Sequence, residues 1–201
     1  MSDDLVDPGR KARLPWRQIN WWLMLIPPAG LLVSVAVSRF DDELFQNLQN
    51  DLEVPAPFMV ALVSVVYLSR AAIQRNVLFG LLGLLATAMT LREVHDLPGL
   101  HFMSKGVYVA LGLVVACGVL LVRRVWAALQ ADWRHTSWLA ATFFGYFLAL
   151  LVMRRAFRSI PGEHHIHRSL EECAETVAHA LFIVTSLVAA WRRPPAKTPP
   201  A

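Results

Sequence analysis

The segment SLEECAETVAH, residues 169–179, carries three glutamates and a histidine into the last apolar stretch of the chain. At 100° per residue, Glu172, Glu175 and His179 fall on one helix face about 60° wide. Ionisable groups inside a membrane segment are costly, face the protein interior and usually have partners. We therefore expect Glu175 and His179 to form one wall of a site. A core histidine satisfied by a single glutamate is the simpler alternative.

A second group of ionisable residues ends the third apolar stretch, in the sequence TLREVHDL. We expect Arg92 to neutralise a carboxylate of the last stretch, whereas Glu93 and His95 add a second acid and a second imidazole. Carboxylate and imidazole together suit zinc, or iron and manganese where carboxylates dominate. The sequence therefore predicts a divalent-metal site whose ligands are Glu93, His95, Glu175 and His179.

The other two glutamates have both a structural and a catalytic interpretation. Residues 169–172, which read SLEE, match the capping box that starts a helix, and carboxylates suit a first helical turn. If the protein is an enzyme, Glu172 or Glu171 would instead be the base that activates a metal-bound water. Because such a site would open at the depth of the lipid headgroups, the expected reaction is hydrolysis of a lipid ester or amide.

Two functions without catalysis fit the same residues. Intramembrane acids and a histidine can form a proton or cation pathway, although only Thr185 and Ser186 continue the polar character of the last stretch toward its other end. The cluster can also hold helices together, or respond to external pH in a structural or sensory subunit. The sequence leaves these alternatives open.

The elements that must position these residues are apolar helices. Hydrophobic residues make up 56% of the 201-residue chain and charged residues 17%, a balance typical of membrane proteins. A hydrocarbon core about 30 Å thick requires roughly 20 residues of helix. Six stretches come near that length, at residues 20–38, 57–73, 77–93, 106–122, 136–153 and 173–191. The sequence thus predicts an all-α, polytopic bundle of six transmembrane helices in a single domain, residues 1–193, followed by a disordered tail, residues 194–201.

Lysine and arginine counts set the expected orientation. With the N-terminus in the cytoplasm, 12 of the 19 Lys and Arg residues lie on the inner side. Both termini are therefore expected in the cytoplasm (N-in/C-in). The Glu/His cluster then lies near the outer face of a cell membrane, which we take to be a bacterial inner membrane.

Local signals predict three details of the spans. Pro27 and Pro28 should kink the first span, because each removes a hydrogen-bond donor. Residues 74–76 leave room only for a tight antiparallel hairpin between the second and third spans. Apolar residues spaced by four in the loop 39–57 predict a short amphipathic helix.

Membrane lipids are the expected partners. The sequence contains no basic stripe interleaved with exposed aromatics, no zinc-finger spacing and no RNA-binding motif, which argues against nucleic acid. Cys117 and Cys173 are too few for a framework of disulfides. A homo-oligomer or another protein partner stays open.

The Arg92-Glu93 pair that ends one span, combined with the Glu171-Glu172-x-x-Glu175 pattern that opens the last, resembles a group of small bacterial multi-pass membrane proteins of unknown function. The resemblance covers the third to sixth spans. It implies a membrane architecture, and it brings no particular activity with it.

Overall fold

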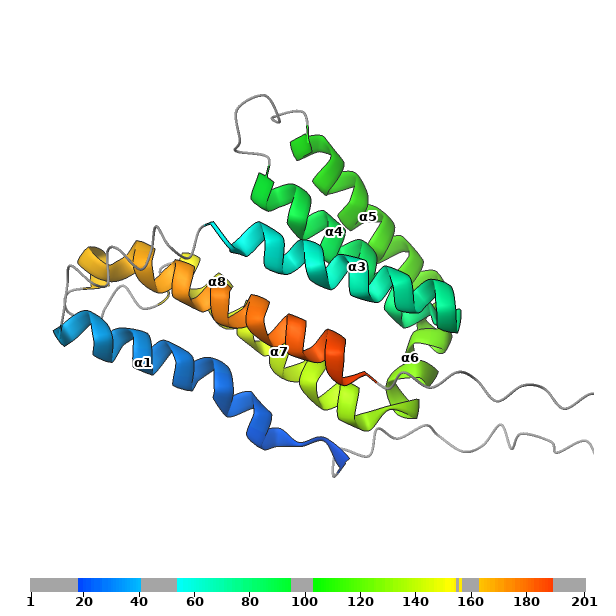
Figure 1. Cartoon of the computed structure of the whole chain (residues 1–201), viewed down its shortest axis with the longest axis horizontal. Helices are drawn as coiled ribbons and strands as arrows, with labels where there is room; N and C mark the ends of the chain where they lie inside the picture. Colours follow the sequence, from blue (N-terminus) through cyan, green and yellow to red (C-terminus); the bar gives the residue numbers. More distant parts are fainter. Residues whose placement is uncertain (1–17, 41–53, 95–102, 155, 157–162, 190–201) are drawn as a thin grey trace, which may run out of the picture.

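The computed structural model describes residues 18–40, 54–94, 103–154, 156 and 163–189. Every regular element in these residues is helical, which confirms the all-α prediction (Figure 1). The elements are the 3-10 helix η2 (Trp21–Leu25) and the α-helices α1 (Ile26–Phe40), α3 (Ala56–Gln74), α4 (Val77–Val94), α5 (Met103–Leu120), α6 (Val122–Ala131), α7 (Trp133–Met153) and α8 (Glu163–Val188).

Three of these helices, α3, α4 and α7, are long and apolar enough to cross a membrane. α5 and α6 pass the same test together, although the chain bends by 82° between them, so a fourth span is supported if this pair counts as one. η2 and α1 contribute a shorter apolar segment, Trp21–Val37. α8 is long enough but carries four glutamates along its length. These helices support a multi-pass membrane protein.

Two antiparallel hairpins organise the bundle, α3 with α4 and α7 with α8. α8 also packs against α3 and α1, so it is the central helix of the arrangement (Figure 1). α5 lies at the edge against α4, and α6 contacts α4, α5 and α7. The end of the bundle that holds α6 and the α3–α4 link is called the α6 end. The opposite end, where α4 finishes, is the Arg92 end.

The core joins α3, α4, α7 and α8. Its buried members include Val60, Val63 and Tyr67 of α3, Phe79 and Leu82 of α4, Leu139 of α7 and Phe182 of α8. The outer surfaces are apolar too, since Tyr108, Val119 and Leu120 of α5 are more than two-thirds exposed. Such a surface is a liability in water and is the ordinary lipid-facing surface of a membrane helix.

A small residue lets α3 and α4 approach closely. A Cβ placed on Gly83 would lie 2.6 Å from Leu68 Cδ2 and 3.1 Å from the Leu68 backbone nitrogen. At this contact the hydroxyls of Ser64 and Thr87 are 2.7 Å apart. Membrane helices commonly pair in this way, through small residues and interhelical hydroxyl contacts.

The tight hairpin predicted at residues 74–76 is confirmed. α3 ends at Gln74, and Arg75 follows with a φ of 51°. This left-handed conformation commonly ends helices, and the residue that adopts it is usually glycine. The side chain of Asn76 then accepts a hydrogen bond from the Leu78 amide at 2.9 Å and starts α4.

The limits of the other spans differ in places from the prediction. Pro27 and Pro28 lie in the first turn of α1, after η2 has ended, so they start a helix instead of kinking one. The predicted span 106–122 ends at Leu120, and α6 follows as a separate helix. The amphipathic helix predicted in the loop 39–57 and the disordered tail 194–201 fall largely or wholly outside the described residues.

Candidate functional site

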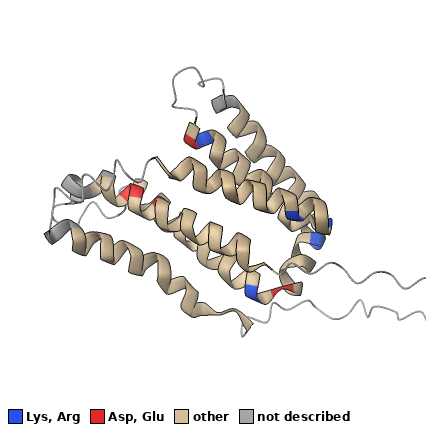
Figure 2. Ribbon diagram, viewed as in Figure 1, with Lys and Arg blue, Asp and Glu red and all other residues tan. Residues whose placement is uncertain are grey.

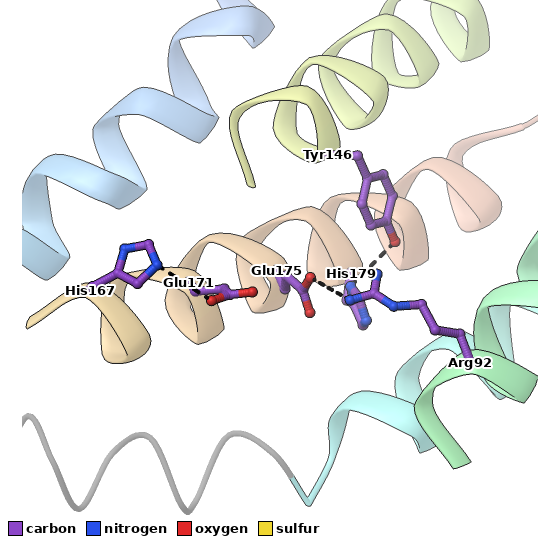
Figure 3. Close-up of polar contacts among 6 residues, drawn as sticks. All are labelled: Arg92, Tyr146, His167, Glu171, Glu175 and His179. Carbon is purple, nitrogen blue, oxygen red and sulfur yellow. Dashed lines mark hydrogen bonds and ion pairs between the residues drawn. The ribbon is translucent and has the colours of Figure 1, made fainter. Parts of the chain in front are cut away.

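An ion pair joins α4 to α8 near the Arg92 end. Arg92 Nη2 donates to Glu175 Oε1 at 3.0 Å, with the arginine side chain 47% exposed and the glutamate side chain 15% exposed (Figure 3). This contact confirms the expectation that Arg92 neutralises a carboxylate of the last helix. Because one of its carboxylate oxygens accepts from the Arg92 guanidinium, the position of the Glu175 side chain is fixed.

His179 lies one helical turn deeper than Glu175 and is only 2% exposed. Its Nδ1 is 3.3 Å from the hydroxyl of Tyr146 on α7, with the two ring centroids 5.6 Å apart. Its other ring nitrogen, Nε2, is buried and has no hydrogen-bond partner within the part of the chain that the structure describes. Figure 3 shows Tyr146 and Arg92 reaching this stretch of α8 from different helices. The prediction that His179 faces the protein interior is therefore confirmed.

The capping-box interpretation of residues 169–172 is wrong. α8 begins at Glu163, so Ser169 is buried inside a helix that has already started. Glu171 instead lies beside His167, with Oε2 and Nε2 3.9 Å apart, and Glu172 is half-buried on the same helix. The catalytic-base role of Glu171 and Glu172 is not tested by this arrangement and stays a prediction.

The four predicted metal ligands are only partly placed. Glu93 is half-buried in the last turn of α4, Glu175 and His179 lie on α8, and His95 is outside the described residues. Among the described residues no three His, Cys, Asp or Glu side chains converge closely enough to hold a metal ion. The divalent-metal site therefore stays a prediction that depends on His95.

A second histidine–tyrosine pair lies toward the α6 end. Tyr67 of α3 and His135 of α7 are both buried, and the tyrosine hydroxyl is 3.0 Å from His135 Nε2. The side chain of Asp132 caps α7 by accepting a hydrogen bond from the His135 amide at 3.0 Å, which fixes the backbone of His135 in the first turn of α7. The fully buried Arg70, three residues after Tyr67, donates to the carbonyl of Leu187 at 3.5 Å and lies 5.8 Å over the Phe79 ring.

Phe182 separates the two pairs. It is 1% exposed, and its ring centroid is 6.0 Å from that of Tyr146 and 5.6 Å from that of Tyr67. Two hydroxyls lie in the same interface, those of Thr142 on α7 and Thr185 on α8, at 2.7 Å from each other. Each hydroxyl also contacts a carbonyl of its own helix, at 3.0 Å and 2.7 Å respectively. The two hydroxyl groups have two protons for these three contacts. The protons can therefore be distributed over the contacts in more than one way.

We call this set of side chains the polar seam: Glu175, His179, Tyr146, Thr142, Thr185, Tyr67, His135 and Arg70. Only Glu175 and His179 were predicted as site residues. The sequence does contain a signal for three of the others, because Tyr67 and Arg70 lie a helical turn apart within an apolar stretch and Tyr146 lies in the middle of another. An ionisable residue in such a stretch is a candidate functional residue by itself.

Neither a model of a known protein family, nor a curated protein, nor a solved structure matches the chain.

Proposed function

We propose that the chain is a six-span membrane protein, N-in/C-in, whose polar seam binds protons at the outer face and relays them toward the inner face. The observation that carries this proposal is the presence of two histidine–tyrosine pairs inside the bundle, Tyr146 with His179 between α7 and α8 and Tyr67 with His135 between α3 and α7. Neutral imidazole accepts a proton at one nitrogen and donates one from the other. A tyrosine hydroxyl likewise donates and accepts.

The charge distribution supports the orientation (Figure 2). Among the described residues, the α6 end holds Arg70, Arg75, Arg123, Arg124 and Arg134. The glutamates of α8 and Glu93 lie toward the opposite end. Under the positive-inside rule, the α6 end faces the cytoplasm. η2 and α1 form the first span and α8 forms the last. In this orientation the seam runs from the outer side inward. The membrane is a bacterial inner membrane.

α8 alone is too apolar to carry protons across the membrane, but the polar seam also includes side chains of α7 and α3. Beyond His179, α8 offers only hydroxyls, but α7 and α3 supply Thr142, His135 and Tyr67. Glu175 at the outer entrance and Arg70 at the inner exit place charges at both ends of the path. The seam is therefore a composite of three helices, and no single helix in the sequence displays it.

Phe182 gives the relay a barrier. Its ring packs between Tyr146 and Tyr67, and among the described residues no continuous hydrogen-bonded chain joins the two pairs. A proton can cross only when this ring moves or when water enters beside it. A barrier of this kind suits a regulated or slow proton pathway, since hydrophobic constrictions gate by excluding water.

The test is proton flux in vesicles that contain purified protein and an internal pH-sensitive dye. A potassium diffusion potential drives protons inward, and the initial rate of acidification is measured. We expect the wild type to exceed protein-free vesicles, and Tyr146→Phe and His179→Asn each to lower the rate at least tenfold. Tyr108→Phe is the matched control, because it removes the same hydroxyl from a lipid-facing side chain. Wild-type rates in folded Tyr146→Phe and His179→Asn would contradict the proposal.

The metal-dependent lipid hydrolysis predicted from the sequence is distinguished by elemental analysis of tag-free protein. The relay needs no metal, so we expect the double variant Glu175→Gln, His179→Asn to leave the metal content unchanged. Near-stoichiometric zinc, iron or manganese in the wild type, lost in the folded double variant, would favour the hydrolase instead.

A further inference from the structure

We propose a second site at the α6 end, a pocket that binds the phosphodiester headgroup of an anionic phospholipid. The pocket lies between the α3–α4 link and α6 and has a volume of about 300 Å³. It is lined by Gln74, Arg75, Asn76, Val77, Arg124 and Ala128. The site is separate from the polar seam, and its function does not depend on proton relay.

The lining of the pocket matches the chemistry of a phosphodiester. Arg75 and Arg124 reach it from different elements, and no carboxylate is among the lining residues that the structure describes. Guanidinium groups bind phosphate oxygens through paired N–H donors. Asn76 adds a donor, because its side-chain oxygen is already engaged by the Leu78 amide at 2.9 Å and its NH₂ group remains available.

The backbone of Arg75 has an unusual conformation. Its φ of 51° is left-handed, a conformation in which glycine is the usual residue at a helix end. An arginine is strained there, and strain of this kind collects at ligand-binding positions. Arg75 is exposed and lines the pocket together with Arg124 and Ala128 of α6.

The position of α6 favours a lipid over a soluble anion. The chain bends by 82° before α6, so this helix lies across the end of the bundle. Val125, Ala128 and Leu129 pack against the core while Arg123 and Arg124 are exposed. An amphipathic helix of this kind lies at the depth of the headgroups, with its basic face toward anionic lipid.

The test is the binding of phosphatidylglycerol to the full-length protein in mild detergent, measured by native mass spectrometry and by the shift in thermal unfolding temperature. Phosphatidylcholine, which carries no net charge, is the reference lipid. We expect phosphatidylglycerol to bind at least tenfold more tightly than phosphatidylcholine. We also expect Arg124→Gln and Arg75→Gly each to weaken it about tenfold.

Arg75→Gly also separates binding from folding, because glycine relieves the left-handed strain. This variant should therefore unfold at the same or a higher temperature without lipid, yet lose the lipid-dependent shift. Arg123→Gln is the matched control, since it removes an exposed charge from α6 outside the pocket lining. An equal loss in Arg123→Gln would overturn the proposal in favour of a diffuse surface charge. A full shift produced by inorganic phosphate alone would show a soluble-anion site instead.

Discussion

Arg92 in the last turn of α4 and Glu175 of α8 are joined by a 3.0 Å contact that is only partly shielded, since the arginine side chain is 47% exposed. Partly exposed pairs contribute little, because solvent and ions screen them. We expect a double-mutant cycle with Arg92→Gln and Glu175→Gln to give a coupling of about 0.5–1 kcal/mol in detergent. The readout is unfolding free energy, and a coupling of about 3 kcal/mol or more would show that the pair is buried in the working protein.

Tyr67 presents the opposite case, because its hydroxyl and His135 Nε2 are buried together. Removing the hydroxyl leaves a buried ring nitrogen without its partner, which costs about 1–3 kcal/mol. Tyr67→Phe should therefore destabilise the protein by that amount. Tyr108→Phe, which alters a side chain that is 77% exposed, should change stability by less than about 0.5 kcal/mol. Equal effects would mean that the Tyr67–His135 contact does not stabilise the bundle.

At the scale of elements, α3 and α4 pack closely at Gly83. A methyl group there would lie 2.6 Å from Leu68 Cδ2 and 2.8 Å from its Cγ, so the helices must separate or Leu68 must change rotamer. We expect Gly83→Ala to cost about 1–3 kcal/mol. Gly112→Ala on α5 is the control, because a Cβ there meets nothing within 4 Å and alanine favours helix. Thermal unfolding in detergent compares the two, and a neutral Gly83→Ala would show that the hairpin is loosely packed.

The elements also show what the sequence could and could not predict. Apolar length was enough to place α3, α4 and α7, and the shortness of residues 74–76 was enough to predict a tight hairpin. The start of α8 was missed because SLEE satisfies the capping-box pattern locally, although the helix has already begun at Glu163. α6 was missed because its Arg123 and Arg124 read as the end of a span, whereas the chain turns by 82° and continues as helix.

Only the site residues that share one face of a single helix could be predicted from the sequence. Glu175 and His179 share a stripe on α8, and Arg92 was expected to reach a carboxylate of this helix. Tyr146 and Tyr67 come from two other helices, and their position depends on how α7 and α3 pack against α8. Spacing along one helix carries no information on that packing.

At the scale of the whole molecule, the orientation can be tested by labelling. In a background with Cys117 and Cys173 replaced by serine, single cysteines at Arg124 and Arg154 probe the two ends of the bundle. Both arginines are exposed, so both cysteines should react when accessible. We expect a membrane-impermeant maleimide to label Arg154→Cys in intact cells and Arg124→Cys only after lysis. The reverse pattern would contradict the N-in/C-in topology.

The central claim is that protons cross the bundle past Phe182, and a gain of function tests it most directly. Phe182→Ala opens the space between Tyr146 and Tyr67, while Phe147→Ala removes the same side chain from a lipid-exposed position on α7. Measured as acidification of vesicles under a fixed potential, Phe182→Ala should conduct protons at least fivefold faster than wild type, and adding His179→Asn should abolish the increase. A folded Phe182→Ala protein with an unchanged rate, or an increase that survives His179→Asn, would contradict a relay through the seam.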